Sequence, residues 1–204
     1  MNQHPDYVLN KINGPKDLKK LSFEELSKLP DEMRQLVLEK DAAIGGHVGP
    51  NLGIMEVTTA FHYVFDAPKD KIVFDVSHQS YGHKMLTGRK NAFLDPDCYN
   101  DVTGYTNPDE SEYDCFTVGH TSTSVSLATG LAQGRDLLSG KENIVAIIGD
   151  GSLSGGLAFE GFNNASVLDS NLIIVINDNQ MSIDENKGGF YRTLKELRET
   201  HGQS

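Results

Sequence analysis

The stretch ENIVAIIGDGSLSGGLAFEGFNNASVLDSNLIIVINDNQMSI, residues 142–183, decides the fold that the sequence predicts. It contains two apolar runs, 144–148 and 172–176, each followed at once by glycine or by Asn and Asp. Short β-branched runs of this kind are typical of buried strands. A helix-like segment over about 157–167 lies between them. Strand, glycine turn, helix and strand make one βαβ unit with parallel strands and a right-handed crossover.

Polar residues follow both strands at the point where each one ends. Asp150 follows the first strand and Asn179 follows the second, and open α/β sheets bind ligands at this edge. Carboxylate and amide oxygens suit Mg²⁺, which takes its remaining ligands from phosphate and water. Gly151 and Ser152 leave backbone N–H groups beside a helix N-terminus, where anions bind. Each short motif alone is compatible with a simple turn or loop, but together they predict a metal-bridged diphosphate site.

These motifs also carry a resemblance to a known family. The pair Gly-Asp-Gly (149–151) and Asn-Asp-Asn (177–179) resembles the thiamine-diphosphate signature of transketolase-like enzymes. Four segments narrow the resemblance to the 1-deoxy-D-xylulose-5-phosphate synthase family: GGHVGPNLG (45–53), FDVSHQSYGHKMLTGR (74–89), ESEYDCFTVGHTSTSVSLATG (110–130) and NDNQMSIDEN (177–186). It runs from about Leu18 to Asn186 and covers only the amino-terminal, diphosphate-binding part of such enzymes.

The resemblance implies thiamine diphosphate and Mg²⁺ as cofactors and assigns residues to them. The metal ligands that it implies are Asp150, Asn179 and the backbone carbonyl of Met181. The cofactor-binding residues that it implies are His78, Gly119, His120, Thr121, Gly151, Ser152 and Asn179. His47 is the implied catalytic residue and assists proton transfer during carbon–carbon ligation.

The residues alone do not decide the roles of His47, His78 and His120. A lone loop histidine such as His47 is usually a surface residue, and His120 could simply satisfy backbone at the start of a capped helix. No acidic or sulfur partner at a local spacing indicates a zinc site. The sequence departs from the family at Ile44-Gly45-Gly46, before His47, and at Ser77, before His78, where relatives often have serines and glycine respectively.

The family resemblance also implies a reaction. It is the condensation of pyruvate with D-glyceraldehyde 3-phosphate to 1-deoxy-D-xylulose 5-phosphate and CO₂, by a homodimer. The glutamate that activates the cofactor and the arginines that hold the aldehyde's phosphate belong to a second domain. We find no second βαβ half in this chain. We therefore expect it to need the remainder of the enzyme, the pyrimidine-binding and carboxy-terminal domains, and to be inactive alone.

Other functions remain possible on the sequence. The chain could be a transketolase half, an oxo-acid dehydrogenase subunit, or a module that binds cofactor or assembles without chemistry. The SEYD and GHTSTS segments favour the synthase. A dinucleotide-binding domain is disfavoured because no G-x-G-x-x-G follows the first strand.

Composition narrows the partners and the compartment. The chain has 204 residues, with 18 Lys and Arg against 29 Asp and Glu, a net charge of −11. Such an acidic chain is a poor candidate for binding nucleic acid or an anionic membrane. The sequence has no membrane-length apolar stretch and no apolar signal-peptide core. Its two cysteines have no disulfide or metal spacing, so we expect a cytoplasmic protein.

The expected architecture is α/β, with a mainly parallel sheet, helices on both faces and the transketolase type of diphosphate-binding domain. We expect an arm and a short helix over 1–30, then the cofactor-binding domain over 31–204. Ser22 and Glu25 form a possible capping box, and Pro30 is predicted to break the helix that they start. Further elements are predicted at 52–65, 71–76 and 123–138, and 88–114 is predicted to be a solvated acidic loop.

Overall fold

The structure is a computed structural model that describes residues 4–178, 186 and 188–201. Its described sheet has three parallel strands in the order β1-β2-β3: β1 (Lys71–Phe74), β2 (Ile144–Gly149) and β3 (Leu172–Asn177). Phe74 pairs with Ile147, and Gly149 pairs with Asn177. The predicted parallel βαβ unit is confirmed, with α8 (Gly156–Ala165) between β2 and β3.

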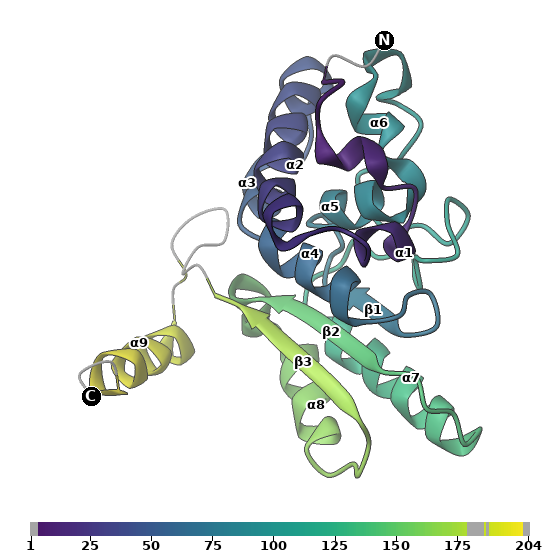
Figure 1. Cartoon of the computed structure of the whole chain (residues 1–204). Helices are drawn as coiled ribbons and strands as arrows, with labels where there is room; N and C mark the ends of the chain where they lie inside the picture. The colour runs from purple at the N-terminus through teal and green to yellow at the C-terminus, as the bar shows by residue number, and fades with distance from the viewer. Residues whose placement is uncertain (1–3, 179–185, 187, 202–204) are drawn as a thin grey trace.

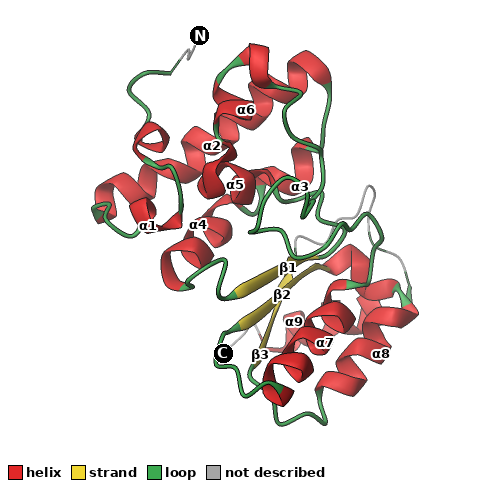
Figure 2. Ribbon diagram, turned by 90° about the vertical axis from the view of Figure 1, so that its right-hand side faces the viewer, coloured by secondary structure: helices red, strands yellow, loops and turns green. Residues whose placement is uncertain are grey.

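Alternate strand residues pack against different helical layers. Ile72 and Val145 face α4 (Met55–Val64), whereas Val73 and Ala146 face α7 (Ser124–Leu137). This alternation follows from the two-residue period of a strand. Figure 2 shows the sheet between the two helical layers. The predicted fold class, a parallel α/β sheet with helices on both faces, is confirmed.

The two helices α7 and α8 approach each other closely at one glycine. A Cβ atom on Gly161 would lie 2.8 Å from Ser126 Oγ and 3.1 Å from Ser126 N. Only glycine fits this contact without a shift of backbone. The glycine therefore helps to set the position of α8, which starts just after the residues that follow β2.

The amino-terminal part of the chain forms a helical layer above the sheet (Figure 1). Its helices are η1 (Val8–Lys11), α1 (Pro15–Leu18), α2 (Phe23–Ile44), α3 (Val48–Leu52), α4, α5 (Tyr81–Lys84), η2 (Met85–Arg89), α6 (Asn91–Leu94) and η3 (Pro96–Cys98). The predicted helix over 52–65 is thus divided between α3 and α4. The first helices share one apolar core with α2, to which Leu9 and Leu18 contribute.

The predicted break at Pro30 is wrong, because α2 continues through it. The Ser22 and Glu25 capping box is confirmed at the start of this helix. A proline in a helix interior costs about 3 kcal/mol, but each buried apolar side chain contributes roughly 1.5–3 kcal/mol. Four such side chains on α2 are fully buried: Leu29, Met33, Leu36 and Val37. The predicted division at residue 30 therefore falls inside a helix.

The predicted strand over 71–76 and the predicted acidic loop over 88–114 both differ in part from the structure. The strand predicted over 71–76 ends at Phe74, because Val76 and Ser77 have φ of 57° and 68°, outside the extended region. The predicted acidic loop contains α6 and η3 and is only partly solvated, since Asp114 is buried. After the described part of β3, α9 (Gly189–His201) follows. None of the described helices has the length and apolar character of a membrane span.

Candidate functional site

The carboxyl end of β1 holds the start of α7. Asp75, directly after β1, is 1% exposed. Its carboxylate accepts hydrogen bonds from the backbone N–H groups of Ser122 (2.9 Å), Thr123 (2.8 Å) and Ser124 (2.9 Å). Asp75 was not among the residues predicted from the sequence, although an acidic residue at a strand end was a signal for it. It fixes the segment 119–124 at the sheet edge.

A second contact joins this segment to the residues after β2. The Ser122 hydroxyl donates to the Ser152 carbonyl at 2.7 Å, and a Cβ on Gly155 would lie 2.0 Å from Ser122 Oγ. Ser122 also has a φ of 70°. Left-handed backbone at non-glycine residues costs about 1–3 kcal/mol and is common at functional sites. Ser122, Val76 and Ser77 place three such residues at one edge of the sheet.

Asp150 occupies the predicted metal position at the carboxyl end of β2. It is 3% exposed, and its Oδ2 accepts a hydrogen bond from Asn186 Nδ2 at 2.7 Å. The Tyr191 hydroxyl donates to the carbonyls of Asp150 and Gly151 at 2.9 and 3.1 Å. Within the described ranges, no three His, Cys, Asp or Glu side chains gather as a metal site. The other two predicted ligands, Asn179 and Met181, lie outside the described residues.

The structure brings His47 and His78 together. Their ring centroids lie 5.7 Å apart in an edge-to-face arrangement. Asn51, fully buried, donates from Nδ2 to the carbonyls of both, at 2.7 Å for His47 and 2.8 Å for His78. Asn51 was not predicted as a site residue; its place in the GPNLG segment is the only sequence signal. It links the start of α3 to the segment that follows β1.

His78 has an unsatisfied atom at this edge. Its Nδ1 is buried and has no hydrogen-bond partner in the part of the chain that the structure describes. Burial lowers the pKa of His78, and the nearby His47 lowers it further. A neutral imidazole with an unused nitrogen is suited to a hydrogen bond with a polar ligand. Of the predicted residues, His78 shows this feature most clearly.

The remaining predicted residues occupy two neighbouring places. Gly151 and Ser152 lie in η4 (Asp150–Ser154), directly after β2. Gly119, His120 and Thr121 are exposed on the turn before α7, where Thr123 Oγ1 donates to the His120 carbonyl at 3.1 Å. Among the described residues, no hydrogen bond joins these three residues to His47 or His78. The sheet edge therefore carries two groups, the histidine pair and the Asp150 turn, with 119–124 between β1 and β2.

A buried carboxylate lies behind His47. Asp41 is 7% exposed, and neither carboxylate oxygen has a hydrogen-bond partner among the described residues. It packs against Gly46, where a Cβ would lie 2.1 Å from Asp41 Oδ1. Burial raises the pKa of Asp41, and the attraction of Lys40 only partly offsets this. The folded state therefore favours the protonated acid and is destabilised when Asp41 ionises.

We expect Asp41→Asn to raise the free energy of unfolding at pH 7.5, because a neutral amide replaces a buried carboxylate that has no hydrogen-bond partner among the described residues. A raised pKa gives stability that is lost as pH rises, so the gain should shrink towards pH 4. Urea denaturation at both pH values measures it. The control is Asp109→Asn, on the exposed loop. A variant less stable than the wild type at pH 7.5 would contradict the prediction.

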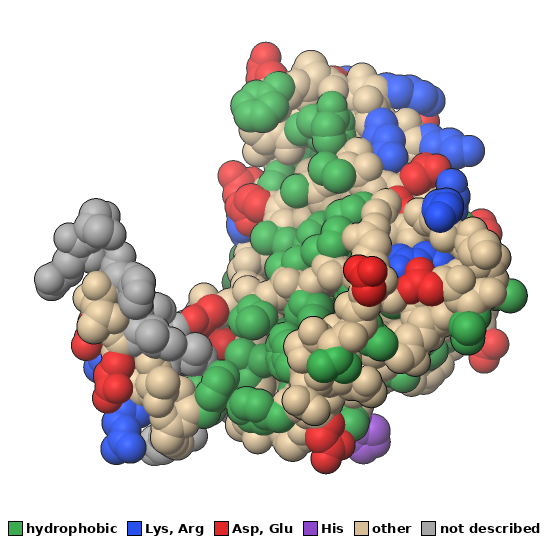
Figure 3. Space-filling model, turned by 90° about the horizontal axis from the view of Figure 1, so that it is seen from below, with side chains coloured by type: hydrophobic (Ala, Val, Ile, Leu, Met, Phe, Trp, Pro, Cys, Tyr) green, Lys and Arg blue, Asp and Glu red, His purple; other side chains and the backbone are tan. Residues whose placement is uncertain are grey.

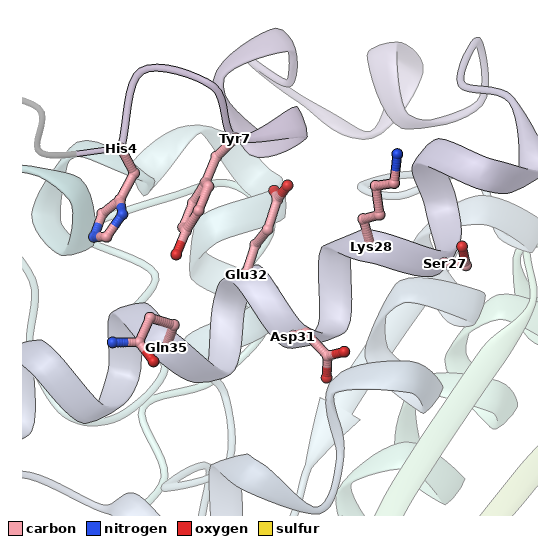
Figure 4. A pocket seen from close by; sticks show the side chains of 7 residues that line it. All are labelled: His4, Tyr7, Ser27, Lys28, Asp31, Glu32 and Gln35. Atoms are coloured by element: carbon pink, nitrogen blue, oxygen red, sulfur yellow. The ribbon is translucent and has the colours of Figure 1, made fainter.

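A shallow pocket of about 510 Å³ lies elsewhere, between the amino-terminal segment and α2. Figure 4 shows its lining residues: His4, Tyr7, Ser27, Lys28, Asp31, Glu32 and Gln35. Its charged groups already serve the fold. Glu32 accepts from the N–H groups of Val8 and Leu9 at 2.9 and 3.0 Å, and Lys28 pairs with Glu24 at 2.8 Å. We therefore place the candidate site at the sheet edge and not in this pocket.

Comparison with known proteins agrees with the geometry. Residues 9–204 match the family model described as 1-deoxy-D-xylulose-5-phosphate synthase. The chain is 49% identical over 193 residues to the synthase of Syntrophomonas wolfei, covering 95% of this chain and 30% of that relative. It is 50% identical over 191 residues to the synthase of Dictyoglomus turgidum, covering 94% of this chain and 31% of that relative.

The chain spans about a third of the length of these relatives. The match runs over nearly all of this chain and includes every described residue of the sheet edge. The chain therefore belongs to the 1-deoxy-D-xylulose-5-phosphate synthase family.

Proposed function

We propose that this chain is the diphosphate- and Mg²⁺-binding part of a thiamine-diphosphate-dependent transferase. The whole enzyme would condense pyruvate with D-glyceraldehyde 3-phosphate to 1-deoxy-D-xylulose 5-phosphate and CO₂. The observation that carries the proposal is Asp150, a buried carboxylate at the carboxyl end of β2, next to a turn that leads into α8. An oxygen ligand at that place suits Mg²⁺ bound to phosphate.

Different residues of the chain would bind the metal ion, bind the diphosphate and carry a proton. Asp150 would bind Mg²⁺ together with Asn179 and the Met181 carbonyl. The groups that would surround the diphosphate are His78, Gly119, His120, Thr121, Gly151 and Ser152. Thiamine diphosphate, when bound, supplies the carbanion stabilisation that decarboxylation of a 2-oxo acid requires. His47 would hold and move a proton beside it.

The cofactor would fit the described groups in two respects. The buried Nδ1 of His78 has no hydrogen-bond partner among the described residues, and a buried polar atom is stable only with one. The turn 150–154 places backbone N–H groups next to the N-terminus of α8, a ten-residue helix, where anions are stabilised. Both features support a polyanionic ligand at this edge.

The surface around β3 supports a partner for this chain. Within the described residues β3 pairs only with β2, and its side chains are half-buried, whereas those of β2 are buried. Ile176, on β3, is 49% exposed. Hydrophobic side chains gather across the middle of the molecule seen from below (Figure 3). We propose that the remainder of the enzyme packs here.

The assembled enzyme would be a cytoplasmic homodimer. Cys98 and Cys115 are free thiols, as is usual in a reducing compartment. Measuring the mass of the assembled enzyme by light scattering tests the dimer.

Calorimetric titration with thiamine diphosphate tests the metal site. We expect binding to require Mg²⁺ and to fall at least tenfold in Asp150→Ala, because the variant loses the one carboxylate among the proposed ligands. Asp109→Ala, on the exposed acidic loop, is the control and should bind like the wild type. Binding that is indifferent to both Mg²⁺ and Asp150→Ala would refute the site.

Should the chain alone bind nothing, the same titration is repeated with the carboxy-terminal part supplied. Binding that then appears, and that Asp150→Ala removes, supports a site completed by the partner domain. Continued absence of binding refutes the proposed function and supports a module used for assembly only.

A further inference from the structure

Two tyrosine hydroxyl groups lie on opposite nitrogens of the His47 ring. The Tyr81 hydroxyl lies 3.2 Å from His47 Nδ1, and the Tyr105 hydroxyl lies 3.4 Å from His47 Nε2. The two aromatic rings lie 6.2 and 5.1 Å from the imidazole, centroid to centroid. Tyr81 is 3% exposed and Tyr105 is 37% exposed. Tyr81 thus lies on the buried side of the His47 ring, and Tyr105 lies on its more exposed side.

The hydrogen bonds of Tyr81 fix the direction of its hydroxyl group. The backbone N–H of His47 donates to the Tyr81 oxygen at 3.2 Å, so the hydroxyl hydrogen must point elsewhere. His47 Nδ1, 3.2 Å from the Tyr81 oxygen, is placed to accept that hydrogen. Burial raises the pKa of Tyr81, and the phenol therefore keeps this hydrogen at neutral pH. A neutral imidazole carries one hydrogen, and an Nδ1 that accepts leaves that hydrogen on Nε2.

We propose that Tyr81 and Tyr105 are positioning residues that select the His47 tautomer with its hydrogen on Nε2. Tyr81 selects the tautomer from the buried side. Tyr105 accepts the Nε2 hydrogen on the open side and keeps its own hydroxyl hydrogen for a ligand. His47 therefore presents a proton donor towards the site, relayed through the Tyr105 hydroxyl.

The segment that carries Tyr105 is held rigidly enough for this role. A Cβ on the preceding Gly104 would lie 3.2 Å from His47 Cε1, so only glycine lets the segment approach this closely without a shift. On the other side, the Thr106 N–H donates to Ser77 Oγ at 3.0 Å. The segment is thus fixed between the histidine and the residues that follow β1.

Two acidic side chains hold the same segment from behind. The Glu110 carboxylate accepts from the Thr103 N–H at 2.8 Å, and the Asp114 carboxylate accepts from the Asn107 N–H at 2.8 Å. These bonds bracket residues 104–106 on both sides. The backbone that carries Tyr105 is therefore held on both sides.

The proposed role of His47 in proton transfer rests on the proposed function, but its tautomer does not. The test is NMR of the chain with ¹⁵N-labelled histidine, without thiamine diphosphate or Mg²⁺, at a pH about 2 units above the ordinary pKa of the histidine side chain. His47→Gln identifies the His47 signals by their absence. We expect Nδ1 to resonate as a bare nitrogen and Nε2 as a protonated one.

Variants then separate positioning from packing. In Tyr81→Phe the two nitrogen shifts of His47 should move towards each other, because the tautomers become mixed. Tyr105→Phe should keep the Nε2–H tautomer but change the Nε2 shift, as that hydrogen loses its acceptor. Tyr63→Phe, an exposed residue of α4, should leave both shifts unchanged.

A wild-type spectrum with the hydrogen on Nδ1 would overturn the proposal, even if Tyr81→Phe fails to fold. Unchanged His47 shifts in a folded Tyr81→Phe would overturn it as well. These spectra are recorded without cofactor. The NMR result therefore tests the tautomer even if the calorimetric test shows that the chain does not bind thiamine diphosphate.

Discussion

The variant Asp114→Asn is expected to lose about 3–5 kcal/mol of its free energy of unfolding, the usual cost of breaking a buried ion pair from one side. The Asp114 side chain is fully buried. Its carboxylate accepts hydrogen bonds from Arg89 at 2.7 and 2.8 Å and from His83 Nε2 at 2.8 Å. Asparagine would leave the Arg89 charge with only the longer contact to Glu110, at 3.3 Å, and place an N–H₂ group against these donors.

The cluster around Asp114 continues into α4. His83 Nδ1 lies 2.9 Å from His62 Nε2, and both rings are buried. Burial lowers the pKa of both His62 and His83, which favours their neutral forms. In those forms His62 Nε2–H is placed to donate to His83 Nδ1, and His83 Nε2–H to Asp114. Arg89 is then the cation that balances Asp114. The destabilisation caused by Asp114→Asn should therefore weaken the packing between α4 and α5 as well as the 103–107 segment.

The pH dependence of stability tests the same group. Burial alone would raise the pKa of Asp114, but the hydrogen bonds from His83 and Arg89 outweigh it and hold the pKa well below its usual range. A lowered pKa gives stability that is present above about pH 4 and is lost as the pH falls further. Urea denaturation from pH 7 to pH 3 should show this loss in the wild type and a smaller one in Asp114→Asn.

Asp109→Asn is the matched control for this variant, since it changes an exposed carboxylate of the same loop. Such a surface change should stay within about 0.5 kcal/mol. An Asp114→Asn variant as stable as Asp109→Asn would show that the buried cluster contributes nothing net.

The sheet and its edge could be predicted from the sequence because their signals are local. The runs 144–148 and 172–176 carry the strand pattern within a few residues, and the turns after them carry the chemistry. The break at Pro30 was wrong because the burial of a helix face, which involves distant residues, outweighs a local preference. Tertiary context overrides propensity in this way throughout folded proteins.

The buried clusters could not be predicted because their partners are far apart in the chain. No local pattern singles out His83, yet it is 1% exposed and forms a hydrogen bond with Asp114, 31 residues away. Asp114 looked like one of many solvated acids in an acidic loop. Nothing local distinguishes it from Asp109, which is exposed. Only the fold shows which carboxylate faces Arg89.

Asp75 is the group at the sheet edge whose loss should have the second large effect. We expect Asp75→Ala to lower the free energy of unfolding by about 3 kcal/mol or more, because hydrogen bonds to a charged group contribute roughly 1.5–3 kcal/mol each and unsatisfied buried donors are costly. Three backbone N–H groups at the start of α7 lose their acceptor at once. An ordinary N-cap residue contributes only about 0.5–2 kcal/mol.

The control for Asp75 is Asp95→Ala. Asp95 also accepts a backbone N–H at a helix start, that of Asp97 at 3.2 Å, but at an exposed three-residue turn. Its loss should cost about 1 kcal/mol or less. Urea denaturation compares the two variants, and amide hydrogen exchange locates the change. Ser122, Thr123 and Ser124 should exchange much faster in Asp75→Ala, while the amides of β2 keep their protection.

The exchange pattern also decides what Asp75 does for the site. If protection is lost at 122–124 alone, Asp75 acts as the anchor that holds the segment 119–121 in place beside the Asp150 turn. Thiamine diphosphate and Mg²⁺ should then bind more weakly, although no proposed ligand has been changed. The opposite result would be retained amide protection at 122–124, with a free energy of unfolding lowered by less than about 1 kcal/mol. Other groups would then hold the start of α7, and the Asp75 carboxylate would be dispensable. The hydrogen bonds predict the first result, because the same carboxylate that ends β1 satisfies all three of these donors.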